Sequence, residues 1–137
     1  LYVTRAVVPG MVQRGRGHII SLGSTAGEMT YPNGAVYCAT KAAERAVSDG
    51  LRQDVLGTPI RVTSVDPGMV ETDFSLVRFR GDAERASKVY KGVMPLTGED
   101  VAETIVWAAS RPSHVNIARI LMTCVQQANS LLFSRNE

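Results

Sequence analysis

The chain has 137 residues, a mass of 14.8 kDa and a formal net charge of +2, so it has room for one compact domain. Hydrophobic residues make up 45% of it and charged residues 20%, a balance that excludes a wholly disordered protein. The basic residues are scattered, which argues against a nucleic-acid-binding surface. No apolar run approaches the roughly 18 residues of a membrane span.

Helical and strand-like segments alternate along the chain. Apolar side chains at helical spacing predict helices, and short β-branched runs bounded by Gly or Pro predict strands. The expected elements are a helix over 2–13, a strand over 18–23, a helix over 35–56, a strand over 60–65, a short helix over 82–92, a helix over 98–110 and a strand over 116–126. The segments 24–34 and 66–81 are expected to be irregular. Thr97 should cap the helix after it, since an acid stands at the third helical position.

This alternation predicts an α/β fold, in which a parallel sheet of the doubly wound Rossmann type has helices on both faces. Three strands are few for such a sheet. Residues 1–137 are therefore expected to be a single partial domain, the C-terminal half of the fold. The glycine-rich turn of the dinucleotide-binding half is absent, because Gly15 and Gly17 precede a strand instead of following one.

Tyr37 and Lys41 stand four residues apart on the predicted helix 35–56, so they share one of its faces. A phenol is a poor acid–base group at neutral pH, and a neighbouring ammonium favours its phenolate form. The pair therefore has the residue types that a catalytic tyrosine needs. The same spacing also occurs on helix surfaces that do no chemistry.

Ser24 directly follows the first predicted strand, and Pro67-Gly68 closely follows the second. Ligands of α/β sheets bind outside the carboxyl ends of the strands, so both segments are expected on one rim. A serine hydroxyl there could donate to a substrate oxygen, and a plain turn is the alternative for both segments. A serine hydrolase is excluded, because Leu22 and Ala26 occupy the places where a nucleophile elbow needs glycine.

Together, Ser24, the Tyr37–Lys41 pair and the segment 67–72 resemble the signature of the short-chain dehydrogenase/reductase family. The resemblance covers essentially the whole chain. It implies a Rossmann-type sheet and reversible hydride transfer between a nicotinamide cofactor and a small substrate.

The resemblance also implies a role for each matched residue. Tyr37 would transfer the proton of the substrate oxygen, Lys41 would favour the phenolate and bind the nicotinamide ribose, and Ser24 would orient the carbonyl. The residues expected along the cofactor are Tyr37, Lys41, Pro67, Gly68, Val70 and Thr72.

Segments 77–82, 96–101 and 111–117 resemble the branch of the family that acts on 3-hydroxy acids and their semialdehydes. That branch implies NADP as the cofactor, with NAD left open because the residue that chooses between them is missing. It also implies a homotetramer, with the helices 2–13 and 35–56 at the main subunit interface.

Arg78 and Arg80 lie in the segment expected to cover the substrate. Either guanidinium could bind a substrate carboxylate through two parallel hydrogen bonds. The alternative is an exposed, solvated arginine at each position.

The cysteines and histidines predict no metal site. Cys38 and Cys124 are expected to be free thiols in a reducing cytoplasm. Neither His18 nor His114 has a Cys, His or acid nearby at ligand spacing.

Two hypotheses of different classes follow. In the first, the complete protein is an NADP-dependent oxidoreductase acting on a small 3-hydroxy acid or its semialdehyde, and residues 1–137 alone are inactive. In the second, the chain is a truncated, non-enzymatic interaction module that binds an intact homologue through its interface helices.

Overall fold

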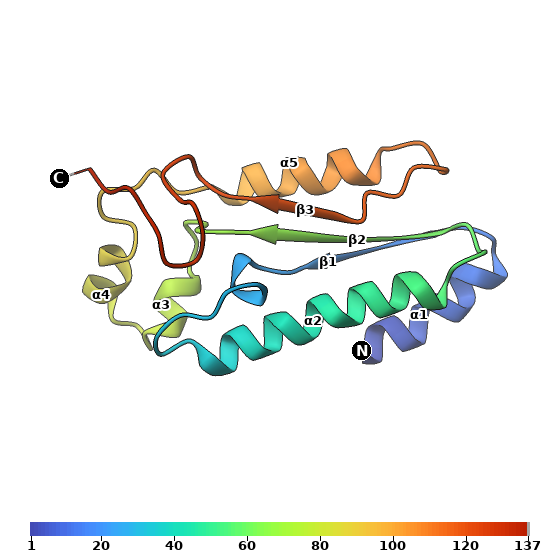
Figure 1. Cartoon of the computed structure of the whole chain (residues 1–137), viewed down its shortest axis with the longest axis horizontal. Coiled ribbons are helices and arrows are strands. Elements are labelled where there is room, and N and C mark those ends of the chain that lie inside the picture. The colour runs from blue at the N-terminus through green and yellow to red at the C-terminus, as the bar shows by residue number, and fades with distance from the viewer. Residues whose placement is uncertain (137) are drawn as a thin grey trace.

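A computed structural model describes residues 1–136 and contains a three-stranded parallel sheet with helices against it (Figure 1). Glu137, the last residue of the expected domain, lies outside the described residues. The elements in chain order are α1 (Tyr2–Gln13), β1 (Gly17–Leu22), the short 3-10 turn η1 (Thr25–Gly27), α2 (Ala35–Asp54), β2 (Ile60–Pro67), α3 (Phe74–Arg78), α4 (Ala83–Lys88), α5 (Gly98–Ala109) and β3 (Arg119–Met122). The predicted α/β class and the alternation of long elements are confirmed.

Three local predictions were wrong. Segment 24–34 contains η1, and segment 66–81 contains α3. The hydroxyl oxygen of Ser75 in α3 lies 2.9 Å from Tyr90 Oη. The last strand was expected over 116–126 but covers only four residues. It is short because its pairing partner β2 ends at Pro67, opposite Met122.

The core of the described chain lies on the central strand β2. Val62 and Val65 are 1% and 0% exposed, since β1 and β3 flank this strand in the order β1-β2-β3. The apolar run over 18–23 predicts a buried strand, and that prediction is wrong. β1 is only half-buried and its Leu22 is exposed, because it is an edge strand of the described sheet.

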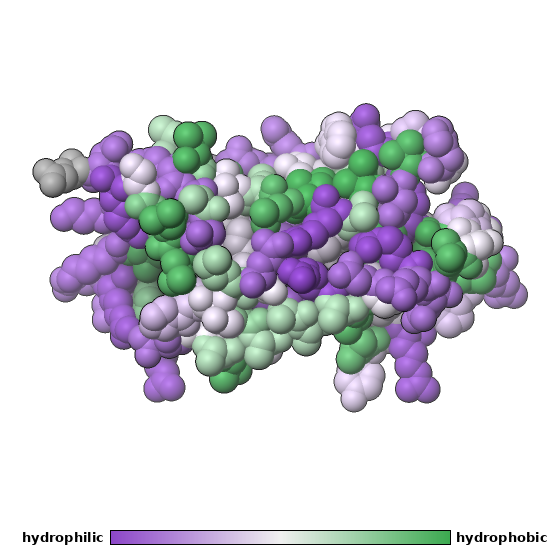
Figure 2. Space-filling model, in the orientation of Figure 1, coloured by the Kyte–Doolittle hydropathy of each residue, from purple (hydrophilic) through white to green (hydrophobic). Residues whose placement is uncertain are grey.

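Helix α2 exposes a face rich in small apolar residues. Figure 2 shows weakly hydrophobic side chains gathered along this helix. Val36 is 80% exposed, and Ala39, Ala42, Ala43 and Ala46 are exposed as well. Small side chains allow another backbone to approach closely, and within residues 1–136 this face stays exposed.

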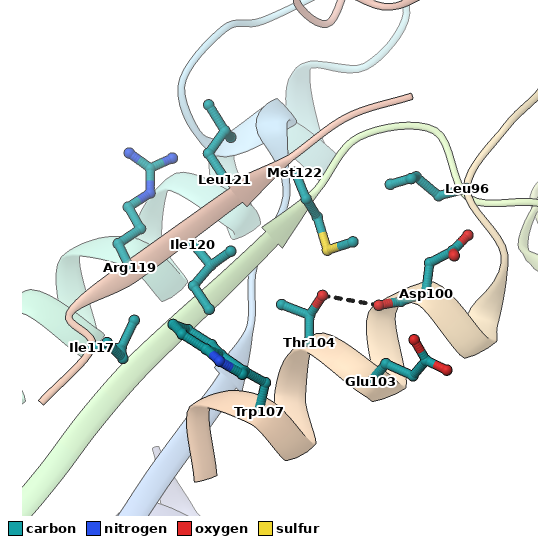
Figure 3. A pocket seen from close by; sticks show the side chains of 10 residues that line it. All are labelled: Leu96, Asp100, Glu103, Thr104, Trp107, Ile117, Arg119, Ile120, Leu121 and Met122. Carbon is teal, nitrogen blue, oxygen red and sulfur yellow. Dashed lines mark hydrogen bonds between the residues drawn. The ribbon is translucent and has the colours of Figure 1, made fainter. Parts of the chain in front are cut away.

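Helix α5 covers the face of β3 opposite to Arg119. Ile120 and Met122 point toward α5, whereas Arg119 points away from it (Figure 3). A hollow of about 850 Å³ lies between α5 and β3 and is lined by Trp107 among others. None of the predicted site residues lines this hollow.

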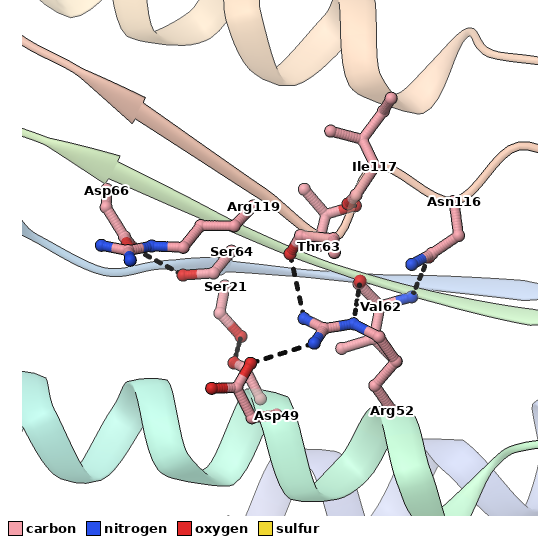
Figure 4. Close-up of polar contacts among 12 residues, drawn as sticks. Ser21, Asp49, Arg52, Val62, Thr63, Ser64, Asp66, Asn116, Ile117 and Arg119 are labelled. Atoms are coloured by element: carbon pink, nitrogen blue, oxygen red, sulfur yellow. Dashed lines mark hydrogen bonds and ion pairs between the residues drawn. The ribbon is translucent and has the colours of Figure 1, made fainter.

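Polar groups of α2 and of the segment before β3 form hydrogen bonds with the sheet and with each other (Figure 4). Arg52 of α2 donates to Ala118 O at 2.9 Å and to Val62 O at 3.4 Å. Asn116 Oδ1 accepts from Val62 N at 2.8 Å. These bonds join α2, the amino-terminal part of β2 and the segment just before β3.

The predicted cap of α5 is confirmed. Thr97 Oγ1 accepts from Asp100 N at 3.2 Å, and Asp100 Oδ2 accepts from Thr97 N at 2.7 Å. The hydrogen bonds that Asp100 Oδ2 accepts from Thr97 N and from Thr97 Oγ1 lower the pKa of Asp100 below its usual range. The two residues therefore satisfy backbone groups at the helix start that would otherwise lack partners.

Replacing the cap residue should weaken the fold by an amount that denaturation can resolve. Thr97→Ala is expected to lower the free energy of unfolding by about 1 kcal/mol, measured by urea denaturation. Thr104→Ala on the same helix removes a hydroxyl that bonds only within the helix, to Asp100 O at 2.9 Å, and serves as the control. Equal stabilities of the Thr97→Ala and Thr104→Ala variants would contradict the cap's contribution.

His18 lies in β1 as a neutral imidazole. Thr63 donates its hydroxyl hydrogen to Ile117 O at 2.6 Å, so His18 Nε2, 2.7 Å from Thr63 Oγ1, carries the hydrogen of that contact. Its Nδ1 is buried and has no hydrogen-bond partner within residues 1–136. Burial and, second, the positive charge of Arg61 lower the pKa of His18 below its ordinary 6.5.

This pKa shift predicts acid sensitivity near neutrality. The unfolded imidazole binds a proton before the folded one does, so the free energy of unfolding should fall as pH drops through 6.5 toward the folded-state pKa. His18→Gln should flatten that slope between about pH 5 and 8, as measured by urea denaturation. The exposed His114 gives the control His114→Gln, which should keep the slope. A slope unchanged in His18→Gln would contradict the assignment.

Candidate active site

A cavity of about 480 Å³ lies at the carboxyl ends of β1 and β2. Its lining residues are Leu22, Gly23, Ser24, Tyr37, Lys41, Pro67, Gly68, Val70, Thr72, Phe74, Gly98 and Val101. Every residue that the sequence suggested as catalytic or cofactor-binding is among them. Segments far apart in the chain thus converge on one cavity at the rim where α/β sheets bind ligands.

Ser24 is placed by a sharp turn at the end of β1. Gly23 N donates to Val65 O at 2.8 Å, which extends the ladder one residue beyond the strand. Ser24 then caps η1, and its Oγ accepts from Ala26 N at 3.1 Å. A Cβ at position 23 would overlap Asp66 Oδ1, so glycine is required directly before Ser24.

Tyr37 and Lys41 enter the cavity from the first turns of α2. Lys41 Nζ donates to Leu22 O at 2.7 Å and lies 6.0 Å from the centre of the Tyr37 ring. That ring packs against Phe74 with centroids 5.4 Å apart. The ammonium is therefore fixed to the end of β1 beside the phenol ring.

The segment 67–72 forms the opposite wall and is anchored through its backbone. Gly68 N donates to Met122 O at 2.8 Å, and Met69 N donates to Gln127 Oε1 at 2.8 Å. A Cβ at Gly68 would overlap the Gln127 side chain. The wall is thus built by close approach of the C-terminal segment to the turn after β2.

A smaller cavity of about 230 Å³ shares Ser24 and Tyr37 with the larger one and is also lined by Arg78. The guanidinium carbon of Arg78 lies 5.3 Å from the Tyr31 ring centre and 5.8 Å from that of Tyr37. Arg80 lines neither of these two cavities. The structure therefore brings Arg78, and not Arg80, to the candidate site.

The residues of the smaller cavity that sequence reasoning missed include Tyr31, Gln127, Ser130 and Phe133. Burial raises the pKa of Tyr31 despite the nearby Arg78. Ser130 Oγ is buried without a hydrogen-bond partner in the described range. The loop ending in Pro32-Asn33-Gly34 could have drawn attention to Tyr31, whereas the last three lie in a stretch with no recognisable pattern.

Within residues 1–136, no group of His, Cys, Asp or Glu side chains is placed to hold a metal ion. In the same range, no helix is both long enough and apolar enough to cross a membrane. Cys38 and Cys124 are buried free thiols.

The arrangement of Ser24, Tyr37, Lys41 and the segment 67–72 around one cavity indicates a class of protein. Residues 1–81 match the family model described as short chain dehydrogenase, and the chain belongs to that family. The resemblance seen in the sequence is thereby confirmed.

The relatives include two bacterial enzymes with the same name. The NADP-dependent 3-hydroxy acid dehydrogenase YdfG of Salmonella typhi is 53% identical over 129 residues, and that of Escherichia coli strain K12 is 51% identical over the same length. Each alignment includes 93% of this chain and 52% of the relative. This chain therefore spans about half the length of the curated relatives it matches.

Solved structures show the same fold. The closed form of serine dehydrogenase complexed with NADP+ is 49% identical, with a TM-score of 0.92, and the match covers 99% of this chain and 55% of that chain. Serine dehydrogenase from Escherichia coli is 44% identical, with a TM-score of 0.75, over 93% of this chain and 49% of that chain. The predicted Rossmann-type architecture is confirmed.

Proposed function

We propose that the natural full-length polypeptide is an oxidoreductase that moves a hydride between NADP(H) and a small 3-hydroxy acid or its semialdehyde. The observation that carries this proposal is the convergence of Ser24, Tyr37 and Lys41 on one cavity with the segment 67–72. The names of the relatives, an NADP-dependent 3-hydroxy acid dehydrogenase and a serine dehydrogenase, support the cofactor and the substrate class.

Ser24, Tyr37 and Lys41 would divide the work on the substrate oxygen. In the reducing direction the Ser24 hydroxyl donates to the carbonyl oxygen, and the Tyr37 hydroxyl gives that oxygen its proton. Lys41 places a positive charge beside the phenol and so favours the phenolate that remains. In the oxidising direction the Tyr37 phenolate takes the proton of the substrate hydroxyl.

The cavity fits the nicotinamide end of the cofactor. Gly68 has no side chain and lies where the backbone lines the cavity, and Lys41 lies in the opposite wall. The residues proposed to hold it are Tyr37, Lys41, Pro67, Gly68, Val70 and Thr72. When bound, NADPH would supply the hydride. The preference for NADP over NAD rests on the relatives, since the residue that selects between them is not in this sequence.

Arg78 is proposed to bind the carboxylate of the substrate. Its guanidinium lies beside the Tyr37 ring and lines the cavity that Ser24 also lines. A carboxylate held there would sit next to the proton donor. A volume of about 230 Å³ favours a short acid over a long-chain one.

Turnover by the full-length polypeptide tests this function. NADPH with malonic semialdehyde should give 3-hydroxypropionate and NADP+, and the loss of reduced-nicotinamide absorbance measures this reaction. NADH should be the poorer hydride donor. No turnover with any 3-hydroxy acid or semialdehyde would overturn the proposal. If the inactive chain instead co-purified with an intact homologue, the interaction-module hypothesis would replace it.

The proposal extends to assembly and compartment. A homotetramer with α1 and α2 at the subunit interface is supported by the exposed small residues of α2. A reducing cytoplasm is supported by the two free, buried cysteines, Cys38 and Cys124. Sedimentation of the full-length polypeptide would test the tetramer, and a monomeric enzyme would contradict it.

A further inference from the structure

A charged cluster lies behind the candidate site, on the α2 side of the sheet (Figure 4). Arg119, the first residue of β3, donates through Nε to Asp66 Oδ2 and through Nη1 to Glu28 Oε1. Asp66 belongs to β2, and Glu28 follows the turn after β1. A single guanidinium therefore joins the start of β3, the carboxyl-end part of β2 and the loop after β1.

The contact with Asp66 is buried. The Asp66 side chain is 1% exposed and that of Arg119 is 29% exposed, and Ser64 Oγ donates to Asp66 Oδ1 at 2.5 Å. A buried carboxylate needs such partners because burial removes its water. Asp66 directly precedes Pro67-Gly68, so the pair fixes the point where the segment along the cofactor cavity begins.

The contact with Glu28 reaches the loop that carries Ser24. Ser24 caps η1 at its start, and Glu28 caps it at its end, with Glu28 N donating to Thr25 O at 3.1 Å. Arg45 of α2 approaches the same Glu28 carboxylate at 3.6 Å. The Glu28 side chain is 37% exposed, and the hydrogen bond from Arg119 holds its pKa below the usual range.

Arg119 also acts on the part of the loop just before Ser24, through its bond to Asp66. Asp66 Oδ1 lies where a Cβ of Gly23 would be, and Glu44 Oε2 borders the same space. The loop is thus held just before Ser24 by packing against Asp66 and just after η1 by Glu28. Both carboxylates are bound by Arg119.

We infer that Arg119 is a positioning residue, which sets Ser24 relative to Tyr37 by binding Asp66 and Glu28 together. This inference rests on the proposed function for its catalytic consequence. A shift of the loop would move the Ser24 hydroxyl away from the substrate oxygen, and small displacements of this kind cost large factors in rate. Arg119 lines neither cavity of the candidate site, so it would act only through the loop.

A double-mutant cycle tests the coupling to Ser24. In the full-length polypeptide, Glu28→Gln should lower kcat by about 10-fold to 100-fold with the dissociation constant of NADP+ unchanged. In a Ser24→Ala background the same substitution should change kcat by less than about 2-fold, since the positioned group is gone. Equal losses in both backgrounds, or no loss in either, would overturn the inference. Glu84→Gln breaks an exposed ion pair with Lys88 and is the matched control.

Hydrogen exchange gives a readout that needs no turnover, so it decides the matter even if the proposed activity fails. Arg119→Lys keeps the charge but loses the fork that binds two carboxylates at once. It should speed amide exchange in residues 23–29 and 66–70, whereas Glu28→Gln should speed it only in 23–29. Exchange in both segments matching the unsubstituted protein would overturn the inference.

Discussion

Tyr37→Phe should lower kcat of the full-length polypeptide by about 100-fold to 10,000-fold, because the group proposed to exchange a proton with the substrate oxygen is lost. The phenyl ring can keep its packing against Phe74, 5.4 Å away. Lys41 keeps its bond to Leu22 O, so the dissociation constant of NADP+ should stay within about 2-fold. Steady-state kinetics and cofactor titration measure the two quantities.

A matched control comes from Tyr2, which is 90% exposed at the start of α1. Tyr2→Phe removes the same atom from a different surface and should leave kcat unchanged. Turnover retained by Tyr37→Phe would remove Tyr37 from the proposed chemistry. A parallel loss of cofactor affinity would instead indicate that the substitution disturbs the whole cavity.

Arg78→Ala should raise KM for substrates that carry a carboxylate by about 10-fold to 100-fold, the range expected for a lost charged hydrogen-bonding partner. Neutral carbonyl substrates should be affected by less than about 2-fold, since they have no anion to bind. The reason lies in the position of its guanidinium, 5.8 Å from the Tyr37 ring centre and beside the cavity of Ser24.

Arg80→Ala is the control for this prediction. Arg80 stands two residues later, has a positive φ of 55° and lines neither cavity of the candidate site. KM for acids and for neutral carbonyls should both stay unchanged in this variant. Equal effects of Arg78→Ala on the two substrate classes would contradict carboxylate binding.

The long elements were predictable because their signals are local. Helix α5 has its stripe of apolar residues and its Thr97–Asp100 cap within a few positions of each other. Helix α3 was missed because it has only five residues and Asp73 gives it no side-chain cap. The burial of β1 was misjudged because exposure depends on which strands lie alongside, which the apolar run does not encode.

The difference between local sequence signals and long-range contacts also applies to the candidate site. Ser24, Tyr37 and Lys41 stand next to strand ends or at helical spacing, so the sequence placed them on one rim. Gln127 reaches the turn after β2 from a segment with no periodicity, through a bond to Met69 N. The contact between Arg119 and Asp66 spans 53 positions, and neither residue carries a local mark of the other. Such pairings arise only once the strands have come together.

Because Gln127 anchors Met69, the candidate site is completed late during synthesis of the chain. Gln127, Ser130 and Phe133 are synthesised after every other residue that lines the two cavities. While these residues remain inside the ribosome, the turn at Gly68 lacks the side chain that holds it, and the smaller cavity lacks part of its lining. A nascent chain with a fully paired β1 and β2 would therefore still have an incomplete smaller cavity, which is completed only after these residues have emerged.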